Sequence, residues 1–309
     1  MRARCGFVAL ALLAAWQPLA AHVGDDAAGD ALALRWSADP DVLLPLLLSA
    51  GAYAGGVARA WRVLGRGRGI GPRRVATFAI GWGVLALALL SPLDVLGLQL
   101  FSLHMLQHEL LMVVAAPLLC AGRPLVAWWW LLPPAGRGAW RAAVRQPAWS
   151  VTWRSLSAPW TAWALHAVVL WGWHLPVAFE AALLQPRWHT VQHVCFLAGA
   201  LLYWWSVLRP APRAQQGVAL LSLFTTLLHT SALGALLALA PHPWYPLYAQ
   251  RSAAWGIDAL TDQQLGGLVM WAPAGLSYAL AALAVAARWI GLRAAVALQP
   301  DVWSRDQAT

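Results

Sequence analysis

The stretch SLHMLQHE (residues 102–109) places His104 and His108 four residues apart inside a long apolar run. A second pair, His189 and His193, has the same spacing in the stretch HTVQH (residues 189–193). Residues four apart lie one above the other on a single helix face. An imidazole inside a bilayer costs free energy unless it is hydrogen-bonded or bound to a ligand. Two such pairs on different helices therefore predict a buried metal or haem site.

The composition is that of a membrane protein. Of the 309 residues, 61% are hydrophobic and 11% are charged, and several apolar runs reach the roughly 20 residues that cross a bilayer. The net charge is +9, but all 21 basic residues are arginines that gather in the connections between the apolar runs. This placement reflects membrane orientation and predicts no nucleic-acid partner. We expect an all-α integral membrane protein embedded in membrane lipid.

The apolar runs predict a bundle of seven transmembrane helices. The runs cover residues 42–64, 75–90, 95–120, 160–179, 189–208, 218–240 and 265–288. A shorter apolar stretch, residues 125–132, ends at Pro133-Pro134 and is expected to lie at the membrane interface or to re-enter the membrane. The predicted organisation is a signal peptide (1–21), an extracytoplasmic segment (22–41), the membrane domain (42–288) and a cytoplasmic tail (289–309).

The arginines predict the orientation of the bundle. They are concentrated after the first, third and fifth spans and in the tail, at Arg59, Arg62, Arg66, Arg68, Arg73, Arg74, Arg123, Arg137, Arg141, Arg145, Arg154, Arg209, Arg213, Arg288, Arg293 and Arg305. The alternate connections hold only Arg35, Arg187 and Arg251. Because cytoplasmic loops carry the excess of basic residues, the N-terminus is expected outside and the C-terminus in the cytoplasm. Most of the intramembrane histidines then fall in the outer half of the bilayer.

The first residues have the features of a cleaved signal peptide. Arg2 and Arg4 precede an apolar run over residues 7–15, and small residues follow at positions 20–21. Cleavage after Ala21 would make His22 the first residue, and a terminal amine beside an imidazole chelates Cu(II) well. The alternative is an uncleaved anchor or cleavage elsewhere, which leaves His22 as an ordinary polar residue.

The choice of ligand follows from the side chains available. Cys5, Cys120 and Cys195 form no Cys-x-x-Cys motif, which argues against a thiolate carrier and against a structural zinc site. Imidazoles suit copper, and the thioethers of Met105 and Met270 suit Cu(I). Paired histidines on different helices suit bis-histidine haem equally well.

Three further histidines have simpler interpretations. His166 and His229 stand alone in their spans, where an imidazole is as consistent with a hydrogen bond between helices as with a ligand. His242 lies between two prolines and is expected to be a loop residue.

The sequence has no phosphate-binding loop, nucleophile elbow or zinc-protease signature, so a conventional hydrolase is not expected.

Several motifs together resemble those of the bacterial CtaG family of cytochrome c oxidase assembly proteins, the multi-spanning family and not the single-span copper chaperone of the same name. The matching stretches are SLHMLQH (102–108), APLL (116–119), GRP (122–124), WGWHLP (171–176), QH (192–193), YWW (203–205) and DQQLGGLVMW (262–271). They follow the family's order over nearly the whole chain.

The resemblance implies a non-enzymatic assembly factor of the bacterial inner membrane that helps deliver copper to a haem–copper cytochrome c oxidase. It implies oxidase subunits as partners and allows for a periplasmic copper donor. The motif positions that carry over are His104, His108, His174, His193, Asp262 and Gln263. With the candidates from the residues themselves, the predicted metal-binding set is His22, His104, Met105, His108, His174, His189, His193, Asp262 and Met270, with the metal site facing the extracytoplasmic side.

Three other functions are compatible with the sequence, although a copper-binding assembly factor is the preferred interpretation. A membrane cytochrome for electron transfer would bind haem and show its absorption bands. A copper transporter would need ligands that continue to the cytoplasmic face, where His166 and Cys120 are the candidates. A purely structural scaffold would tolerate the loss of both histidine pairs.

The arginine distribution makes a direct prediction about topology. A reporter that is active only in the cytoplasm should be active when fused after Arg68 or Arg141 and silent when fused after Gln185 or Ala253, because the positive-inside rule puts the first two positions inside. Activity measured in whole cells checks this, and the reverse pattern would place the histidines on the other side of the membrane.

Overall fold

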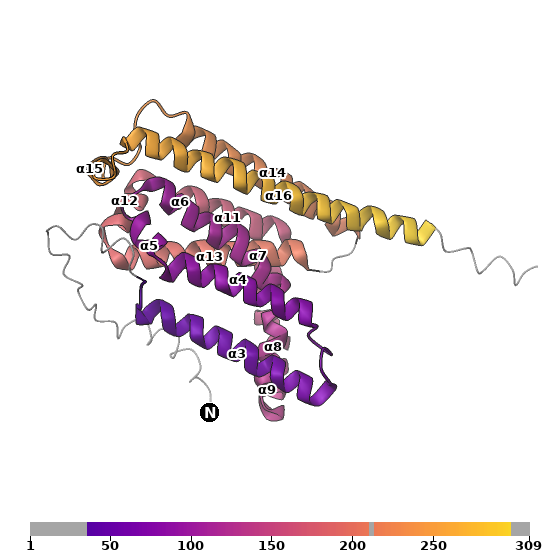
Figure 1. Ribbon diagram of the computed structural model, residues 1–309. Coiled ribbons are helices and arrows are strands. Elements are labelled where there is room, and N and C mark those ends of the chain that lie inside the picture. The colour runs from indigo at the N-terminus through magenta and orange to yellow at the C-terminus, as the bar shows by residue number, and fades with distance from the viewer. Residues whose placement is uncertain (1–35, 210–212, 298–309) are drawn as a thin grey trace, which may run out of the picture.

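The structure is a computed structural model that describes residues 36–209 and 213–297, and every regular element within them is a helix. The long helices lie side by side in one bundle, with α3 along one side and the pair α14 and α16 along the other (Figure 1). The bounds are α3 (Pro40–Leu64), α4 (Pro72–Leu90), α5 (Pro92–Gly97), α6 (Phe101–Glu109), η1 (Leu110–Ala115), α7 (Ala116–Ala121), α8 (Pro124–Leu131), α9 (Pro134–Arg145), α10 (Pro147–Leu156), α11 (Pro159–Trp173), α12 (Pro176–Leu184), α13 (Pro186–Leu208), α14 (Arg213–Ala238), α15 (Tyr248–Ala253) and α16 (Ala259–Ala297).

Six helices in the described residues are long and apolar enough to cross a bilayer, and a bent pair would make a seventh. The six are Pro40–Leu64, Pro72–Leu90, Phe101–Ala121, Pro186–Leu208, Gln215–Ala238 and Ala259–Gly291. Large apolar side chains such as Val177, Leu239 and Leu48 point outward, whereas histidine, glutamine, serine and threonine side chains are buried between the helices. A bilayer requires this arrangement, because its hydrocarbon interior cannot form hydrogen bonds with polar side chains.

The fourth predicted span is bent. Residues 160–179 were expected to form one helix, but α11 ends at Trp173, α12 begins at Pro176 and their axes differ by 70°. Proline disfavours the helical conformation in the residue before it, and Leu175 is accordingly extended, with φ −61° and ψ 132°. The bend puts His174 at a corner, where its side chain faces the interior of the bundle.

The third span starts later than predicted and contains a wider helical turn. Residues 92–97 form the separate helix α5, and the membrane-length helix runs from Phe101 to Ala121 with the π-helical segment η1 inside it. Pro117 has no N–H to donate, and the N–H of Ala116 reaches back five residues to the carbonyl of Leu111. The carbonyl of Met112 instead accepts a hydrogen bond from Trp204 Nε1 at 2.9 Å, which ties this span to α13.

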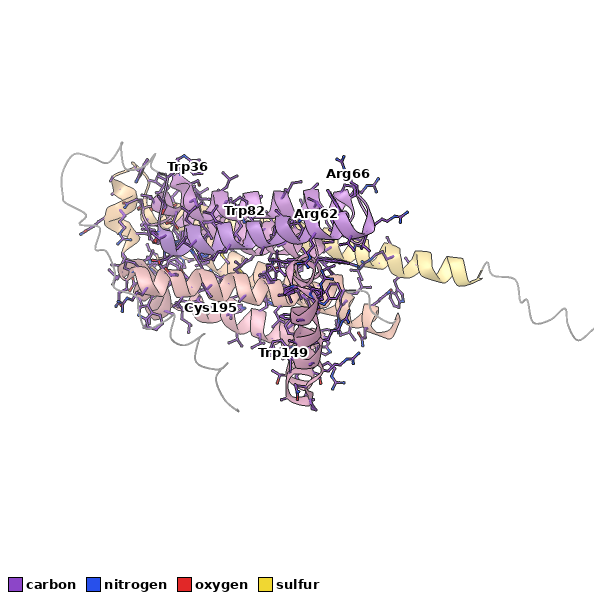
Figure 2. All side chains as sticks on the ribbon, turned by 90° about the horizontal axis from the view of Figure 1, so that it is seen from below. Trp36, Arg62, Arg66, Trp82, Trp149 and Cys195 are labelled. Atoms are coloured by element: carbon purple, nitrogen blue, oxygen red, sulfur yellow. The ribbon has the colours of Figure 1, made fainter. Side chains whose placement is uncertain are left out.

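The short apolar stretch over residues 125–132 forms α8, which packs across α3. Gly56 makes this contact possible, because its backbone lies so close to the backbone of Ala127 that no Cβ would fit between them. Arg59 Nη1 also donates a hydrogen bond to the carbonyl of Leu131 at 3.1 Å. The helices α9 and α10 that follow have no buried residues, and the segment near Trp149 projects away from the bundle (Figure 2).

The two ends of the bundle differ in character. Arg62 and Arg66 lie near one end of α3, while Trp36 lies near the other (Figure 2). The short elements α5, α12 and α15 gather at the end opposite to the connection between α3 and α4 (Figure 1). The predicted orientation and the predicted domain bounds stay predictions, and the predicted signal peptide (1–21) lies outside the described residues.

Helices α14 and α16 pack through glycines. A Cβ added to Gly267 would lie 2.5 Å from the backbone N of Ala238 and 2.7 Å from the carbonyl oxygen of Gly234. Small residues allow helices in a membrane to approach closely and gain dispersion contacts. This pair therefore depends on the absence of side chains at these two positions.

We expect Gly267→Ala to destabilise the protein by about 1–3 kcal/mol, because the added methyl group overpacks a backbone contact that cannot shift freely. Thermal unfolding of the purified protein, followed by helical circular dichroism, measures the effect. The matched control is Gly83→Ala, where a Cβ meets nothing within 4 Å and the protein should be equally or slightly more stable. Equal losses for both variants would contradict the close packing of α14 on α16.

Candidate metal centre

The two predicted histidine pairs face each other. Within the pairs the ring centroids are 4.3 Å apart for His104 and His108 on α6, and 4.2 Å apart for His189 and His193 on α13. Across the pairs they are 5.5 Å apart for His104 and His189, and 5.4 Å apart for His108 and His193. We call these four residues the histidine cluster. The four-residue spacing in the sequence produces the stacking, and the packing of the bundle brings the two stacks together.

The nitrogens of the cluster are buried and largely unpartnered. Within the described residues, neither ring nitrogen of His104 or His108 makes a hydrogen bond of standard geometry, and the same is true of Nε2 of His189 and His193. The backbone of Gly97 and the side chain of Gln192 are the nearest polar groups to the ring of His104. Ligand atoms from His104, His189 and His193 lie within 4.8 Å of one another. Buried polar atoms are nearly always satisfied in native structures, so a convergent unsatisfied set is a candidate binding site. Three converging imidazoles are a donor set that a transition-metal ion can use.

His174 adjoins the cluster from the corner between α11 and α12. Its ring centroid is 6.4 Å from that of His108, and its Nδ1 lies 2.6 Å from the carbonyl oxygen of Leu170. An N–H at Nδ1 donates this hydrogen bond and leaves Nε2 as a free electron pair donor. Nε2 has no hydrogen-bond partner in the part of the chain that the structure describes. Tyr245 fixes the corner by donating its hydroxyl hydrogen to the carbonyl of His174 at 2.8 Å.

Asp94 on α5 is a site residue that the sequence did not reveal. Its carboxylate interacts electrostatically with His189 and accepts a hydrogen bond from Gln107 Nε2 at 2.7 Å. Burial raises the pKa of the Asp94 carboxyl group, and His189 and Gln107 partly offset that rise. A carboxylate beside a ligating histidine orients the ring and raises its basicity. The signal in the sequence was an acidic residue next to a predicted span, but its partner is far away along the chain.

Aromatic rings cover the cluster at the end of the bundle where α5, α12 and α15 meet. The ring centroid of Phe179 lies 5.0 Å from that of His104 and 4.1 Å from that of Tyr245. The hydroxyl group of Tyr248 donates a hydrogen bond to the carbonyl of Gly97 at 2.8 Å and so ties α15 to α5. These contacts keep water away from the imidazoles, which strengthens any electrostatic interaction formed there.

The two predicted methionines occupy different surroundings. Met270 lines a cavity of about 10 Å³ together with His108 and His174, so its thioether is close to the cluster. Met105 is fully buried where α6 packs against Gly266 of α16. The cavity has further polar lining residues, namely Glu109, Thr230 and Tyr278. The Oε2 atom of Glu109 is buried and has no hydrogen-bond partner among residues 36–209 and 213–297.

Asp262 has a different neighbourhood from the histidines. Its Oδ2 accepts the N–H of Phe101 at 2.5 Å, and its Oδ1 accepts the N–H and the hydroxyl group of Ser102 at 3.1 and 2.5 Å. The carboxylate therefore caps the first turn of α6 from a distant helix, where the helix dipole favours a negative charge. The adjacent Gln263 accepts the N–H of Trp244 at 2.5 Å. Both residues position the helix and the loop that enclose the cluster.

The remaining histidines lie apart from the cluster. His242 is exposed in the loop after α14, as the flanking prolines indicated. His22 lies outside the described residues, so its predicted role at a processed N-terminus stays a prediction. His166 and His229 lie deeper in the bundle, with ring centroids 6.1 Å apart.

Comparison with known proteins gives one family. The model of the cytochrome c oxidase caa3 assembly factor family (Caa3_CtaG) matches residues 51–291. The chain is also 24% identical over 256 residues to uncharacterized proteins of Mycobacterium bovis and Mycobacterium tuberculosis. These matches cover 81% of this chain and 38% of each relative, so the chain spans well under half of their length. No solved structure matches the chain.

Asp262→Ala separates a capping role from a ligand role. As a cap, its loss should destabilise the protein by about 1–3 kcal/mol, because the buried donors of Phe101 and Ser102 lose their acceptor. Thermal unfolding and metal content are measured on the same preparation. Asp258→Ala is the comparison variant, since exposed Asp258 caps the first turn of α16 through the N–H groups of Leu260 and Thr261, and its loss should cost about 0.5–2 kcal/mol without changing the metal content. A fall in metal content with unchanged unfolding temperature would instead make Asp262 a ligand.

Proposed function

Because the chain belongs to the cytochrome c oxidase caa3 assembly factor family, we propose that it binds copper at the histidine cluster and delivers it to a haem–copper cytochrome c oxidase during assembly. Copper is in this view the cargo of the protein. The observation that carries the proposal is the convergence of His104, His189 and His193, whose ligand atoms lie within 4.8 Å of one another.

The donor set favours copper over other ions. The cluster offers neutral imidazole nitrogens, and the neighbouring Met270 offers a thioether close to His108 and His174. Copper lies at the top of the affinity order for such nitrogen donors, and thioethers add preference for Cu(I). Calcium and magnesium prefer carboxylate and carbonyl oxygens, and the three converging side chains supply none.

The room available favours one ion over haem. The three ligand atoms are within reach of a single ion, and the adjoining cavity measures about 10 Å³. A pocket for a molecule the size of a drug or cofactor occupies about 300–1,000 Å³. The alternative of a bis-histidine cytochrome has no comparable support in the packing around these rings.

The arrangement suits an ion that must leave again. A ring of three histidines leaves a coordination position open, as sites that exchange a ligand require. His108 lies beside the three converging histidines, and His174 lies beside His108. An ion can therefore move from one imidazole ligand to the next without contact with the lipid hydrocarbon. Transfer between neighbouring ligands avoids the cost of exposing a charge to lipid.

We further propose that the cluster faces the extracytoplasmic side of a bacterial inner membrane. The cluster lies on α6 and in the first turns of α13. Helix α6 lies toward the end of the bundle that is opposite to the arginine-rich connection of α3 and α4 (Figure 1). The positive-inside rule assigns the arginine-rich end to the cytoplasm. The expected partners are oxidase subunits and a periplasmic copper donor.

The proposal is tested by changing His104, His189 and His193 to alanine, singly and together. Each single change should lower the copper bound per purified chain, and the triple variant should lose the cluster's copper, because an incomplete set of ligands holds the ion weakly. Copper per chain is measured by elemental analysis, and assembled oxidase activity is measured in membranes. Added copper should partly restore the activity if delivery is the step that fails.

One control and one further variant make this test specific. His242→Ala changes an exposed loop histidine and should leave copper content and oxidase activity unchanged. Asp94→Asn keeps the shape of the side chain that faces His189 and should weaken copper binding about 10–100-fold, which is the usual cost of losing an orienting partner. Unchanged copper per chain in the triple variant would contradict the histidine cluster as the copper site, whatever the oxidase activity.

A further inference from the structure

A second pair of histidines lies deeper in the bundle, and the proposed copper site does not use it. His166 on α11 is 1% exposed, and His229 comes from the neighbouring helix α14. None of the four ring nitrogens of these two residues has a hydrogen-bond partner within the described part of the chain, and all four are buried. Two isolated core histidines would ordinarily be satisfied by a neighbouring helix. Here the packing leaves both rings unsatisfied and next to each other.

The separation of the two rings fits an ion between them. Their centroids are 6.1 Å apart. A metal–nitrogen bond is about 2.0 Å and the nitrogen lies about 1 Å from the ring centre, so two imidazoles on opposite sides of one ion have centroids about 6 Å apart. A direct hydrogen bond between the rings would bring the centroids closer, to about 5 Å. The centroid distance therefore leaves room for one ion between the two rings, and it exceeds that of a direct hydrogen bond.

The surroundings suit a singly charged soft ion. The rings of Tyr203 and Tyr278 lie 5.0 and 6.5 Å from that of His166, and the ring of Trp163 lies 5.9 Å from that of His229. These rings surround the two imidazoles with apolar surface and leave little room for water. The cost of burying an ion grows with the square of its charge, so a monovalent ion with two ligands is favoured over a divalent ion that needs four.

A polar path connects this pair to the histidine cluster. The cavity beside His108 is lined by Glu109, Thr230 and Tyr278, and the ring of Tyr278 in turn lies next to His166. Thr230 follows His229 directly in α14. Side chains that carry oxygen atoms thus lie between the two sets of histidines.

We propose that His166 and His229 form a second Cu(I) site in the interior of the bundle, which receives the ion from the histidine cluster through the cavity beside Glu109. This inference rests on the proposed copper cargo, but it concerns different residues and can fail separately. It also gives the isolated histidines a shared role that neither has alone.

The test is an anaerobic Cu(I) titration of the full-length protein in lipid nanodiscs against a chromophoric Cu(I) chelator. The wild-type chain should bind two ions, the His104→Ala, His189→Ala, His193→Ala variant one, and His166→Ala or His229→Ala one. His242→Ala is the matched control and should bind two. X-ray absorption of the copper left in the triple variant should show a shell of about two nitrogen ligands.

Each outcome is decisive for one site. If both His166→Ala and His229→Ala still bind two ions, or if the folded triple variant binds none, the second site is overturned. If the triple variant and the wild type bind one ion each and His166→Ala binds none, the second site stands and the histidine cluster fails as the copper site. Zn(II) bound at the inner pair as tightly as Cu(I) would also overturn the proposal. Should His166→Ala not fold, which thermal unfolding reveals, His229→Gln carries the same prediction.

Discussion

The organisation of this protein depends on the lack of water inside a bilayer, which forces every buried polar group to find a partner in the protein or in a bound ligand. Most groups do so within the chain. Gln107 binds Asp94 and the carbonyl of Ala88, and Asp262 caps the first turn of α6. Among the described residues, the ring nitrogens of His104 and His108 make no such hydrogen bond. Asp94, Gln107 and Asp262 therefore help to hold the bundle together, whereas the imidazoles of the histidine cluster are available to an ion.

Two irregularities of the backbone, both at prolines, determine the direction of side chains in and beside the histidine cluster. Pro176 bends the chain by 70° after α11 and turns His174 toward His108. Pro117 accompanies the wide turn of η1, which begins directly after the His108–Glu109 pair and frees a carbonyl for Trp204. A straight α-helix at either place would direct the following side chains to other neighbours. Prolines that look like interruptions of apolar runs therefore serve to shape the site.

Much of the fold and part of the site could be predicted from the sequence, for reasons that apply residue by residue. Apolar length and composition identify the long helices, because both depend only on local sequence. Stacking of His104 on His108 follows from the helical repeat. The role of Asp262 could not be predicted in the same way, since its partners Phe101 and Ser102 lie on another helix. Asp94 was missed because the whole segment from α6 to α12 lies between it and His189 along the chain.

By itself the sequence determined the family, the membrane-length helices and the two histidine pairs, since each of these depends on spacing along one segment. Only the tertiary structure decided that the pairs face each other at 5.4–5.5 Å, that His166 approaches His229, and that Asp262 caps a helix. The physical reason is that contacts between helices are set by side-chain packing across the bundle, where a glycine such as Gly267 or a proline such as Pro176 fixes the approach and direction of a whole helix.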